Sequence, residues 1–489
     1  MIPAVVSIAL FIVLTITFSF KTKRGKFLPP GPSGLPIIGY LHKLGSKPLH
    51  LLLADLGETY GDIFSLQLGS RLTVILNSKD AVYETFVKKA KIFAGRPDLA
   101  TFTTTRHGAT GISMCDYTDE YKRNRQMTLK AMHSLYADKE RFNEILQHEA
   151  TKMINLFNEK SLTNERFDPA NEFHKVVPSI MVHVMYGKNS PYDDKDVMSL
   201  VNVNKRWFQS AEGSNPADFL KFLERFPNKR LDAIQESCMM FYKFAFQKME
   251  EYEQQECSGL YGTYIQLYKE KTGVTELTNK DRFELGRCVN DMLGGGFDTL
   301  AATLTWALLY LWKRPEVIAK CREEIERVLS DEDMIGLHHE KQLSYCMATT
   351  HELLRVCSVA PLGLPRKTME EVKIGEFVIP KDTMVMPNLW SINNQTELWK
   401  NAEQFSPENF LDEEGHLELK SIRNIATFSV GVRRCPGEKF ATLQLFVLLT
   451  NYIKNFNFDV CKPPQDMIPQ GGLTLQAKPF MIKVSKVDQ

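Results

Sequence analysis

Apolar residues recur along most of this chain with the spacing of helices that bury one side. The pattern is strongest over Lys139–Glu159, Leu231–Glu256, Lys280–Arg314 and Glu316–Leu329, where apolar residues return every three or four positions. Runs that alternate like strands are fewer and shorter. The pattern therefore predicts a mainly α body with a minor β part.

The β-rich runs lie toward the two ends of the chain. Asp62–Ser78 contains two such runs around a Gly-Ser turn, which predicts a hairpin, and Val372–Asn388 and Leu473–Ser485 have a similar character. We therefore expect a small sheet that gathers strands from distant parts of the chain. No repeat or low-complexity tract interrupts residues 40–489, so a single large domain is the simplest organisation.

The amino-terminal segment has a different pattern. Ile2–Phe20 is 19 residues long and carries no charge, and a helix of that length reaches about 28 Å, close to the hydrocarbon thickness of a bilayer. Four basic residues follow within positions 21–26, whereas a cleavable signal peptide has the reverse order. Residues 1–20 are predicted to be a single-pass signal-anchor with the following body in the cytosol. A buried helix of a soluble domain is the alternative.

Residues 21–39 are predicted to connect this anchor to the body. They begin basic, and Leu28–Gly39 then contains four prolines and three glycines, which are incompatible with a helix or a central strand. We expect a stiff elbow between the membrane and the domain.

Charge and cysteine content exclude two classes of protein. Lys+Arg number 60 and Asp+Glu 59, for a net charge of +1, so the basic excess of a nucleic-acid binder is missing. The nine cysteines form no closely spaced pair, which argues against a disulfide framework and against a structural zinc site. Most are expected to be small buried hydrophobes in a reducing compartment.

The long apolar stretch Val289–Trp312 contains residues that a helix would be more stable without. Gly294–Gly296 each cost about 1 kcal/mol relative to alanine, and Asp298 and Thr299 follow in apolar surroundings, where a charged carboxylate is expensive. Close helix packing would explain the glycines. The sharper hypothesis is a helix that passes beneath a flat ligand and brings an acid and a hydroxyl to it, with Phe297 as a weak candidate for a substrate-contacting wall.

The stretch FSVGVRRCPG, residues 428–437, places one cysteine between two arginines and a Pro-Gly turn. Cys435 could be a zinc ligand, half of a disulfide, a nucleophile or a thiolate bound to another group. Arg433 and Arg434 supply positive charge, and a tight loop can direct backbone N–H groups at the sulfur, so both features favour the thiolate. A nucleophile and an iron-bound thiolate both fit this arrangement.

Taken together, these residues resemble the cytochrome P-450 family. Phe428, Gly431, Arg433, Cys435 and Gly437 match its F-x-x-G-x-R-x-C-x-G signature, and residues 295–299 match its A/G-G-x-D/E-T motif. Glu352-x-x-Arg355 stands between them in the expected order. The resemblance covers nearly the whole chain, and it is closest in look to the animal microsomal group with steroid 17α-hydroxylase-like and aromatic-hydrocarbon-oxidising members.

The resemblance implies the cytochrome P-450 fold and a haem b (iron protoporphyrin IX) whose axial ligand is Cys435. Phe428 would pack on the haem and Gly437 belongs to the same loop. The residues that match propionate-binding positions of the family are Arg125, Arg366 and Arg433, together with Tyr121 where the family has tryptophan.

A structural brace is also implied by the resemblance. Glu352 and Arg355 would form it, but Asn409 stands where the family has an arginine. Asparagine keeps a donor and loses a charge, so a weaker brace and easier haem loss are expected.

The activity implied by the resemblance is a haem-thiolate monooxygenase acting on a lipophilic substrate, steroid-like or xenobiotic, with O2. Asp298 would relay protons and Thr299 would direct them. The chain has no GxGxxG of its own, so electrons would come from an NADPH-cytochrome reductase, with cytochrome b5 as a second candidate donor. The reductase would dock on a basic patch near the cysteine, drawn from Arg434, Lys439, Lys88, Lys89, Lys122 and Arg123.

Two other classes stay open beside this one. A thiolate-haem isomerase or dehydratase would act on peroxides or aldoximes without a reductase, and a haem-binding sensor would catalyse nothing. Neither has an evident use for the acid-alcohol pair at residues 298 and 299. The implied location is the endoplasmic reticulum membrane, with membrane lipid around a single-pass anchor and the catalytic domain facing the cytosol.

Overall fold

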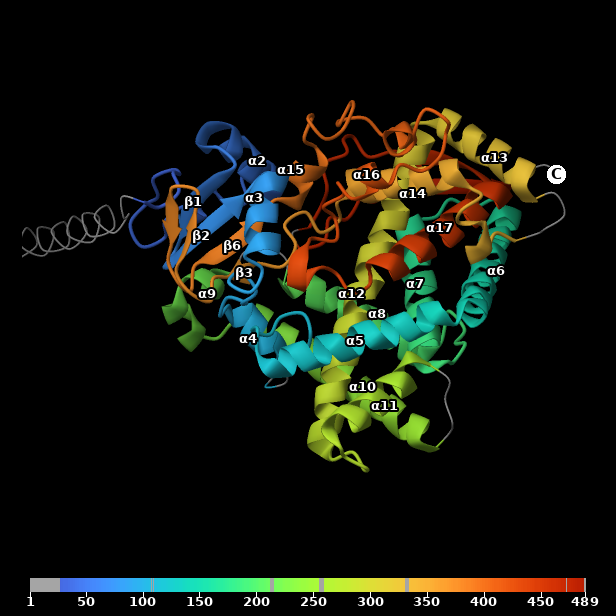
Figure 1. Ribbon diagram of the computed structural model, residues 1–489. Coiled ribbons are helices and arrows are strands. Elements are labelled where there is room, and N and C mark those ends of the chain that lie inside the picture. Colours follow the sequence, from blue (N-terminus) through green and yellow to red (C-terminus); the bar gives the residue numbers. More distant parts are fainter. Residues whose placement is uncertain are drawn as a thin grey trace, which may run out of the picture.

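The computed structural model describes residues 27–106, 108, 110–211, 215–254, 259–329, 334–471 and 473–487. Helices make up most of this part of the chain and strands a small share, as the hydrophobic pattern predicts. Figure 1 shows the largest sheet on one side of the molecule and most of the helices packed together on the other.

The four long periodic stretches are confirmed as α6, α10, α12 and α13. The α-helices in chain order are α2 (Leu49–Tyr60), α3 (Lys79–Tyr83), α4 (Ala100–Arg106), α5 (Asp119–Ala137), α6 (Lys139–Thr163), α7 (Pro169–Tyr186), α8 (Lys195–Ala211), α9 (Pro216–Phe219), α10 (Lys229–Gln254), α11 (Leu260–Thr272), α12 (Asn279–Trp312), α13 (Pro315–Leu329), α14 (Ser344–Cys357), α15 (Leu389–Asn393), α16 (Leu419–Ile422) and α17 (Glu438–Asn455). Shorter helical turns are η1 (Leu41–Lys43), η2 (Glu84–Lys88), η3 (Lys221–Arg225), η4 (Leu337–His339), η5 (Pro407–Phe410) and η6 (Gly431–Arg433).

The main sheet joins distant parts of the chain, as expected, but the β-rich run near the carboxyl end belongs to a separate two-stranded sheet. Its strand order is β1-β2-β6-β3. The predicted hairpin pairs β1 with β2, β6 lies parallel to β2, and β3 is antiparallel to β6. The strands are β1 (Ile63–Leu68), β2 (Arg71–Leu76), β3 (Arg366–Lys367) and β6 (Met384–Pro387), with a separate pair of β4 (Val372–Ile374) and β5 (Phe377–Ile379).

The strand prediction for the last β-rich run is confirmed only for its second half. Its second half is β8 (Met481–Lys486), whereas its first half is not a strand. The partner of β8 is β7 (Phe456–Lys462), which follows α17 without a break. The sequence pattern did not predict β7, which begins directly after the apolar helix α17. This strand is defined by its hydrogen bonds to β8, near the carboxyl end of the chain.

The helix α12 runs through the interior and positions the rest of the molecule. A capping box between Thr278 and Asp281 starts it, and Pro315 follows its end. It packs along α7 and also against α10, α14 and α17, and Figure 1 shows it passing beside α7 through the middle of the helical part. Its central residues therefore face the core on several sides.

The predicted anchor, residues 1–20, and the first part of the connection, up to residue 26, lie outside the described residues. Among the residues that are described, no helix combines the length and the apolar character needed for a bilayer span. The proline-rich part of the connection lies on the sheet, since Ser65 of β1 donates hydrogen bonds to the carbonyls of Pro29 and Pro30.

Candidate active site

Cys435 lies in the loop between η6 and α17, and the backbone of this loop is closely constrained. The Cys435 N–H donates to the Phe428 carbonyl at 2.9 Å. Gly431 has a φ of +74°, and a Cβ atom at this position would lie 1.8 Å from the Phe86 carbonyl oxygen. Only glycine fits there, so the signature glycine allows the loop to pack on η2.

Two opposing influences act on the Cys435 thiol. Desolvation by the surrounding protein raises its pKa, whereas a hydrogen bond from the Gly437 N–H and the charges of Arg125 and Arg434 act in the other direction. Desolvation prevails and the pKa of the thiol is raised, although Cys435 as a residue has exposed surface. A free thiol here would therefore stay protonated and be a poor nucleophile. A bound metal cation would make it a thiolate outright.

The other two roles for this cysteine find no support in the described part of the chain. Every cysteine there is free, and no group of three His, Cys, Asp or Glu side chains is placed to hold a metal ion. The Gly437 N–H and the charges of Arg125 and Arg434 around Cys435 are compatible with a thiolate bound to a group that the protein does not itself supply.

Two buried arginines on this side of the molecule keep unpaired donors. Arg366 donates to Ser429 Oγ and the Val430 carbonyl, and Arg433 donates to the carbonyls of Ala94 and Cys115. In each guanidinium the Nη1 atom is buried without a partner. Because an unsatisfied buried donor costs about 1–3 kcal/mol, these two atoms point to an acceptor that is not part of the chain.

Sequence reasoning missed a third arginine of this cluster. Arg96 is 6% exposed and donates to the carbonyls of Ser113, Leu364 and Pro365. Desolvation, and then the nearby charge of Arg433, lower the pKa of Arg96 to about 9. Desolvation and the charges of Arg96 and Arg433 also hold the pKa of Arg366 well below its usual value.

None of these three arginines forms an ion pair with a carboxylate in the described residues. Like charges gathered in a buried site need anions nearby. The Arg-Pro dipeptide at residues 96–97 is a weak sequence signal that gives no reason to place this arginine beside the other two.

Tyr121 and Arg125 of α5 approach the same region. The Tyr121 ring lies under the Arg433 guanidinium at 3.7 Å, and its hydroxyl donates to the Val432 carbonyl at 3.3 Å. Arg125 donates to the Arg434 carbonyl. In this geometry Tyr121 orients Arg433 through its ring, while its only O–H donor is used on the backbone.

The three glycines of α12 face different surroundings. A methyl group on Gly296 would meet the Met181 side chain of α7 at 2.6 Å, whereas nothing lies within 4 Å of a methyl group on Gly295. Gly296 thus allows close helix packing, and Gly295 leaves an open surface in the middle of a buried helix. The Thr299 hydroxyl, one turn along the same face, donates to the Gly295 carbonyl at 2.8 Å. Close helix packing therefore explains Gly296, and the open space beside Gly295 is compatible with a ligand at this position, which stays a prediction.

Asp298, the residue before Thr299, has contacts of a different kind. The residue as a whole is 5% exposed, and its carboxylate accepts a hydrogen bond from Gln476 Nε2 at 2.9 Å. The second carboxylate oxygen lies 3.4 Å from His174 Nε2 on α7. Neither partner was identified from the sequence.

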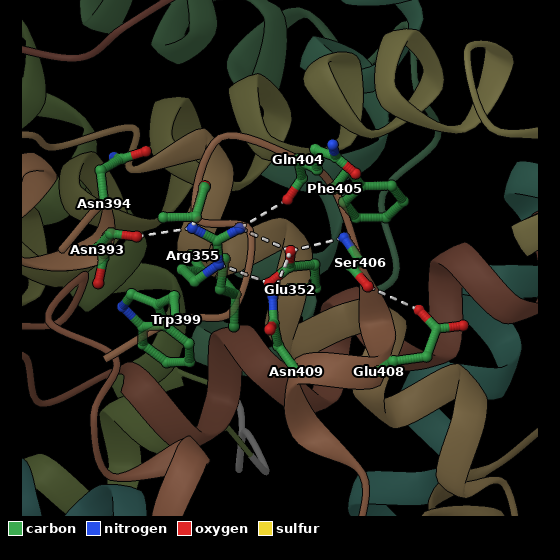
Figure 2. Close-up of polar contacts among 12 residues, drawn as sticks. Glu352, Arg355, Asn393, Asn394, Trp399, Gln404, Phe405, Ser406, Glu408 and Asn409 are labelled. Carbon is green, nitrogen blue, oxygen red and sulfur yellow. Dashed lines mark hydrogen bonds and ion pairs between the residues drawn. The ribbon is translucent and has the colours of Figure 1, made fainter. Parts of the chain in front are cut away.

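Glu352 and Arg355 of α14 form a fully buried, two-point ion pair (Figure 2). Arg355 Nε and Nη2 donate to the two Glu352 oxygens at 2.6 and 2.7 Å. The remaining three N–H groups donate to the carbonyls of Asn393, Ala402 and Gln404. All five guanidinium donors are therefore used, and α14 is tied to the chain segment that precedes η5.

Comparison with known proteins agrees with this geometry. The family model for cytochrome P450 matches residues 29–484. The chain belongs to the cytochrome P450 family. It is 30% identical to cytochrome P450 1A5 of Gallus gallus, over 97% of this chain and 92% of that protein. It is also 29% identical to cytochrome P450 1A1 of Oryctolagus cuniculus (93% and 90%) and 28% identical to steroid 17-alpha-hydroxylase/17,20 lyase of Squalus acanthias (99% and 97%).

The protein is therefore a cytochrome P450 monooxygenase, and its cofactor is protoporphyrin IX haem iron with an axial cysteine thiolate. The described residues fit that group. Cys435 is exposed, and Arg366 and Arg433 each hold a buried Nη1 group whose N–H donors could bind a haem propionate. When bound, the iron supplies the chemistry that activates O2.

Three other residues that the sequence singled out can now be placed. Asn409 Nδ2 reaches Glu352 Oε1 at 3.3 Å, the longest hydrogen bond in the brace (Figure 2). Phe297 is 1% exposed within the main core, and its contact with a substrate stays a prediction. Phe428 is partly buried against the same core.

Proposed function

We propose that this cytochrome P450 inserts one oxygen atom from O2 into a lipophilic organic substrate, steroid-like or xenobiotic, using electrons from an NADPH-dependent reductase. The observation that carries the proposal is the exposed Cys435 in a loop that contains Arg433 and is bonded by Arg366, with unpaired donors on both arginines. The substrate class is supported by the relatives, one of which is a steroid hydroxylase by name.

In this proposal Asp298 and Thr299 handle the protons that oxygen chemistry consumes. Thr299 stands on the open face of α12, one turn from Gly295, and Asp298 is the buried acid next to it in the chain. The same pair argues against an isomerase, dehydratase or sensor, because none of these has a use for a proton relay.

An electron donor would approach the surface around the cysteine loop. The basic residues expected to attract it are mostly paired with carboxylates of the chain itself. These pairs are Arg434–Glu438, Lys88–Glu84, Lys89–Glu84, Lys122–Asp119 and Arg123–Glu284. Long-range attraction of an acidic partner would therefore be modest, and docking to a reductase or to cytochrome b5 would depend more on shape.

Attachment to the endoplasmic reticulum membrane, facing the cytosol, is part of the proposal. Apolar side chains are exposed on two segments that both contact the β1–β2 turn, since Gly69 N–H donates to the Ile38 carbonyl and Ser70 N–H to the Phe219 carbonyl. Those exposed residues are Leu35, Ile37, Phe222 and Phe226. They would extend the membrane contact of the predicted anchor to the adjacent body.

Two measurements test this function. The full-length protein, reduced and treated with carbon monoxide, should give the absorption band typical of sulfur-ligated ferrous haem, and Cys435→Ala should lose it. Product formation from a panel of steroids and aromatic compounds should require NADPH, reductase and O2 together. Turnover of a peroxide or an aldoxime without reductase would instead support the alternative function.

A further inference from the structure

His174 of α7 faces the carboxylate of Asp298, and neither the family motifs nor the proposed relay include this histidine. His174 Nε2 lies 3.4 Å from Asp298 Oδ1, and His174 Nδ1 lies 2.7 Å from the Ala170 carbonyl oxygen. Asp298 Oδ2 accepts from Gln476. The carboxylate is thus held between α7 and the segment before β8.

These contacts determine where the hydrogens are. A carbonyl oxygen can only accept, so His174 Nδ1 must carry a hydrogen. In a neutral imidazole Nε2 then bears a lone pair, which would face a carboxylate oxygen that also only accepts. The contact is attractive only if one further proton lies between Nε2 and Oδ1. A pair that shares one proton at this contact carries no net charge.

Burial gives the same answer on independent grounds. The Asp298 side chain is 7% exposed and that of His174 is 24% exposed. A lone carboxylate at such depth is expensive, whereas a pair that holds one proton leaves no net charge. The charged groups next to His174 on α7 already have partners, because Glu172 pairs with Lys175 and with Lys160 of α6. Of the two members of the pair, His174 is the one in contact with solvent.

We propose that His174 loads Asp298 with protons from solvent and so acts as the inlet of the proton relay. Solvent protonates Nε2, and the imidazolium passes that proton to Asp298 Oδ1. His174 returns to its neutral form with Nδ1–H still bonded to Ala170. Asp298 then gives up the proton toward Thr299 and becomes a carboxylate ready for the next one. His174 acts through Asp298 and is a positioning residue, and the inference rests on the proposed function of residues 298 and 299.

The test uses the full-length holoenzyme with reductase and compares His174→Gln with His183→Gln. Glutamine keeps an N–H donor for Asp298 but cannot take up a proton. His183 is a matched control, since it also lies on α7 and contacts a buried carboxylate, Glu149, at 2.9 Å. Hydrogen peroxide released per NADPH should rise about tenfold in His174→Gln, a small share of what a general acid contributes. KM should not change.

A second readout separates this role from a structural one. The midpoint of chemical unfolding should be the same for His174→Gln and the natural protein, because the hydrogen bond to Asp298 is kept. Wild-type peroxide release in His174→Gln, or an equal rise in His183→Gln, would overturn the proposal. Thr299→Ala distinguishes the two levels. If Thr299→Ala leaves peroxide release per NADPH unchanged, the proposed proton relay through residues 298 and 299 is wrong. If Thr299→Ala raises peroxide release and His174→Gln does not, only the proposed role of His174 is wrong.

Discussion

At the scale of single residues, the brace depends on how Glu352 is satisfied. Burial raises the pKa of Glu352, and Arg355 and the Ser406 N–H oppose that rise. Glu352 Oε1 accepts from Arg355, Ser406 and Asn409, but only Arg355 carries a charge. The side chain at 409 is the weakest of these donors, and it is partly exposed, so a longer side chain has room at this position.

Asn409→Arg should therefore stabilise the folded holoenzyme by about 1 kcal/mol and slow the loss of haem, because a charged donor replaces a neutral one at a buried carboxylate. Chemical unfolding and haem transfer to an acceptor protein measure the two effects. Asn409→Lys is the control and should gain less, since it lacks the planar fork. No gain in either quantity would contradict the idea that asparagine weakens the brace.

His351 makes the stability of α14 depend on pH. Desolvation lowers its pKa from 6.5 to about 4, so between those values the unfolded chain binds a proton that the folded chain does not. Stability is full above pH 6.5 and falls as the pH drops toward 4, by at most about 3 kcal/mol from this residue. In His351→Gln the loss of stability across this window should be shallower. The same substitution at the exposed His416 should change nothing.

At the scale of elements, one turn of α12 has a closely packed side next to an open side. Gly296 meets Met181 of α7, and Gly295 meets nothing within 4 Å. The two glycines carry the same cost in helix propensity, so they differ only in what surrounds them. Comparing an alanine substitution at each glycine therefore distinguishes effects on helix stability from effects on the shape of the site.

Gly295→Ala should raise the free energy of unfolding by about 1 kcal/mol through helix propensity, and it should slow the oxidation of bulky substrates by placing a methyl group on the open face. Gly296→Ala should show no such gain, because its methyl group requires Met181 to move. Denaturant unfolding and a substrate panel of graded size measure both. Equal stability changes in the two variants would show that the packing difference has no energetic effect.

At the scale of the whole molecule, the fold brings together three buried cations that a bound cofactor would partly neutralise. Arg96, Arg366 and Arg433 come from segments far apart in sequence, and their buried charges repel one another. Propionates would neutralise part of that charge. Cofactor binding is thus coupled to the stability of the fold around the main sheet.

Arg366→Met should consequently have opposite effects in the two forms of the protein. It should weaken haem retention in the holoprotein, and it should stabilise the haem-depleted protein by about 1–4 kcal/mol, since an unpaired buried charge is replaced by an apolar side chain. Unfolding curves with and without added hemin measure this. Arg327, whose side chain is 71% exposed, provides a control at which methionine should alter neither form.

Much of the site could be predicted because its chemistry is local. Cys435, Arg433 and the glycines of the loop lie within ten residues. Their types favour a thiolate, and the resemblance to the family then implies that it binds haem iron. Arg96 could not be predicted in the same way, because its role follows from the proximity of two other arginines. The same holds for His174 and Gln476, which reach Asp298 from 124 and 178 residues away. The strand β7 was not predicted, because its partner β8 lies beyond a segment without regular structure.

The sequence by itself determined the helical character of the body and the hairpin, and it singled out Cys435 as the candidate sulfur ligand, because periodicity and short motifs depend on neighbouring residues. Only the tertiary structure decided which charges are left unpaired, which face of α12 is open and where the carboxylate of Asp298 points. Those features are set by burial and by contacts between distant segments, which exist only after the chain has folded.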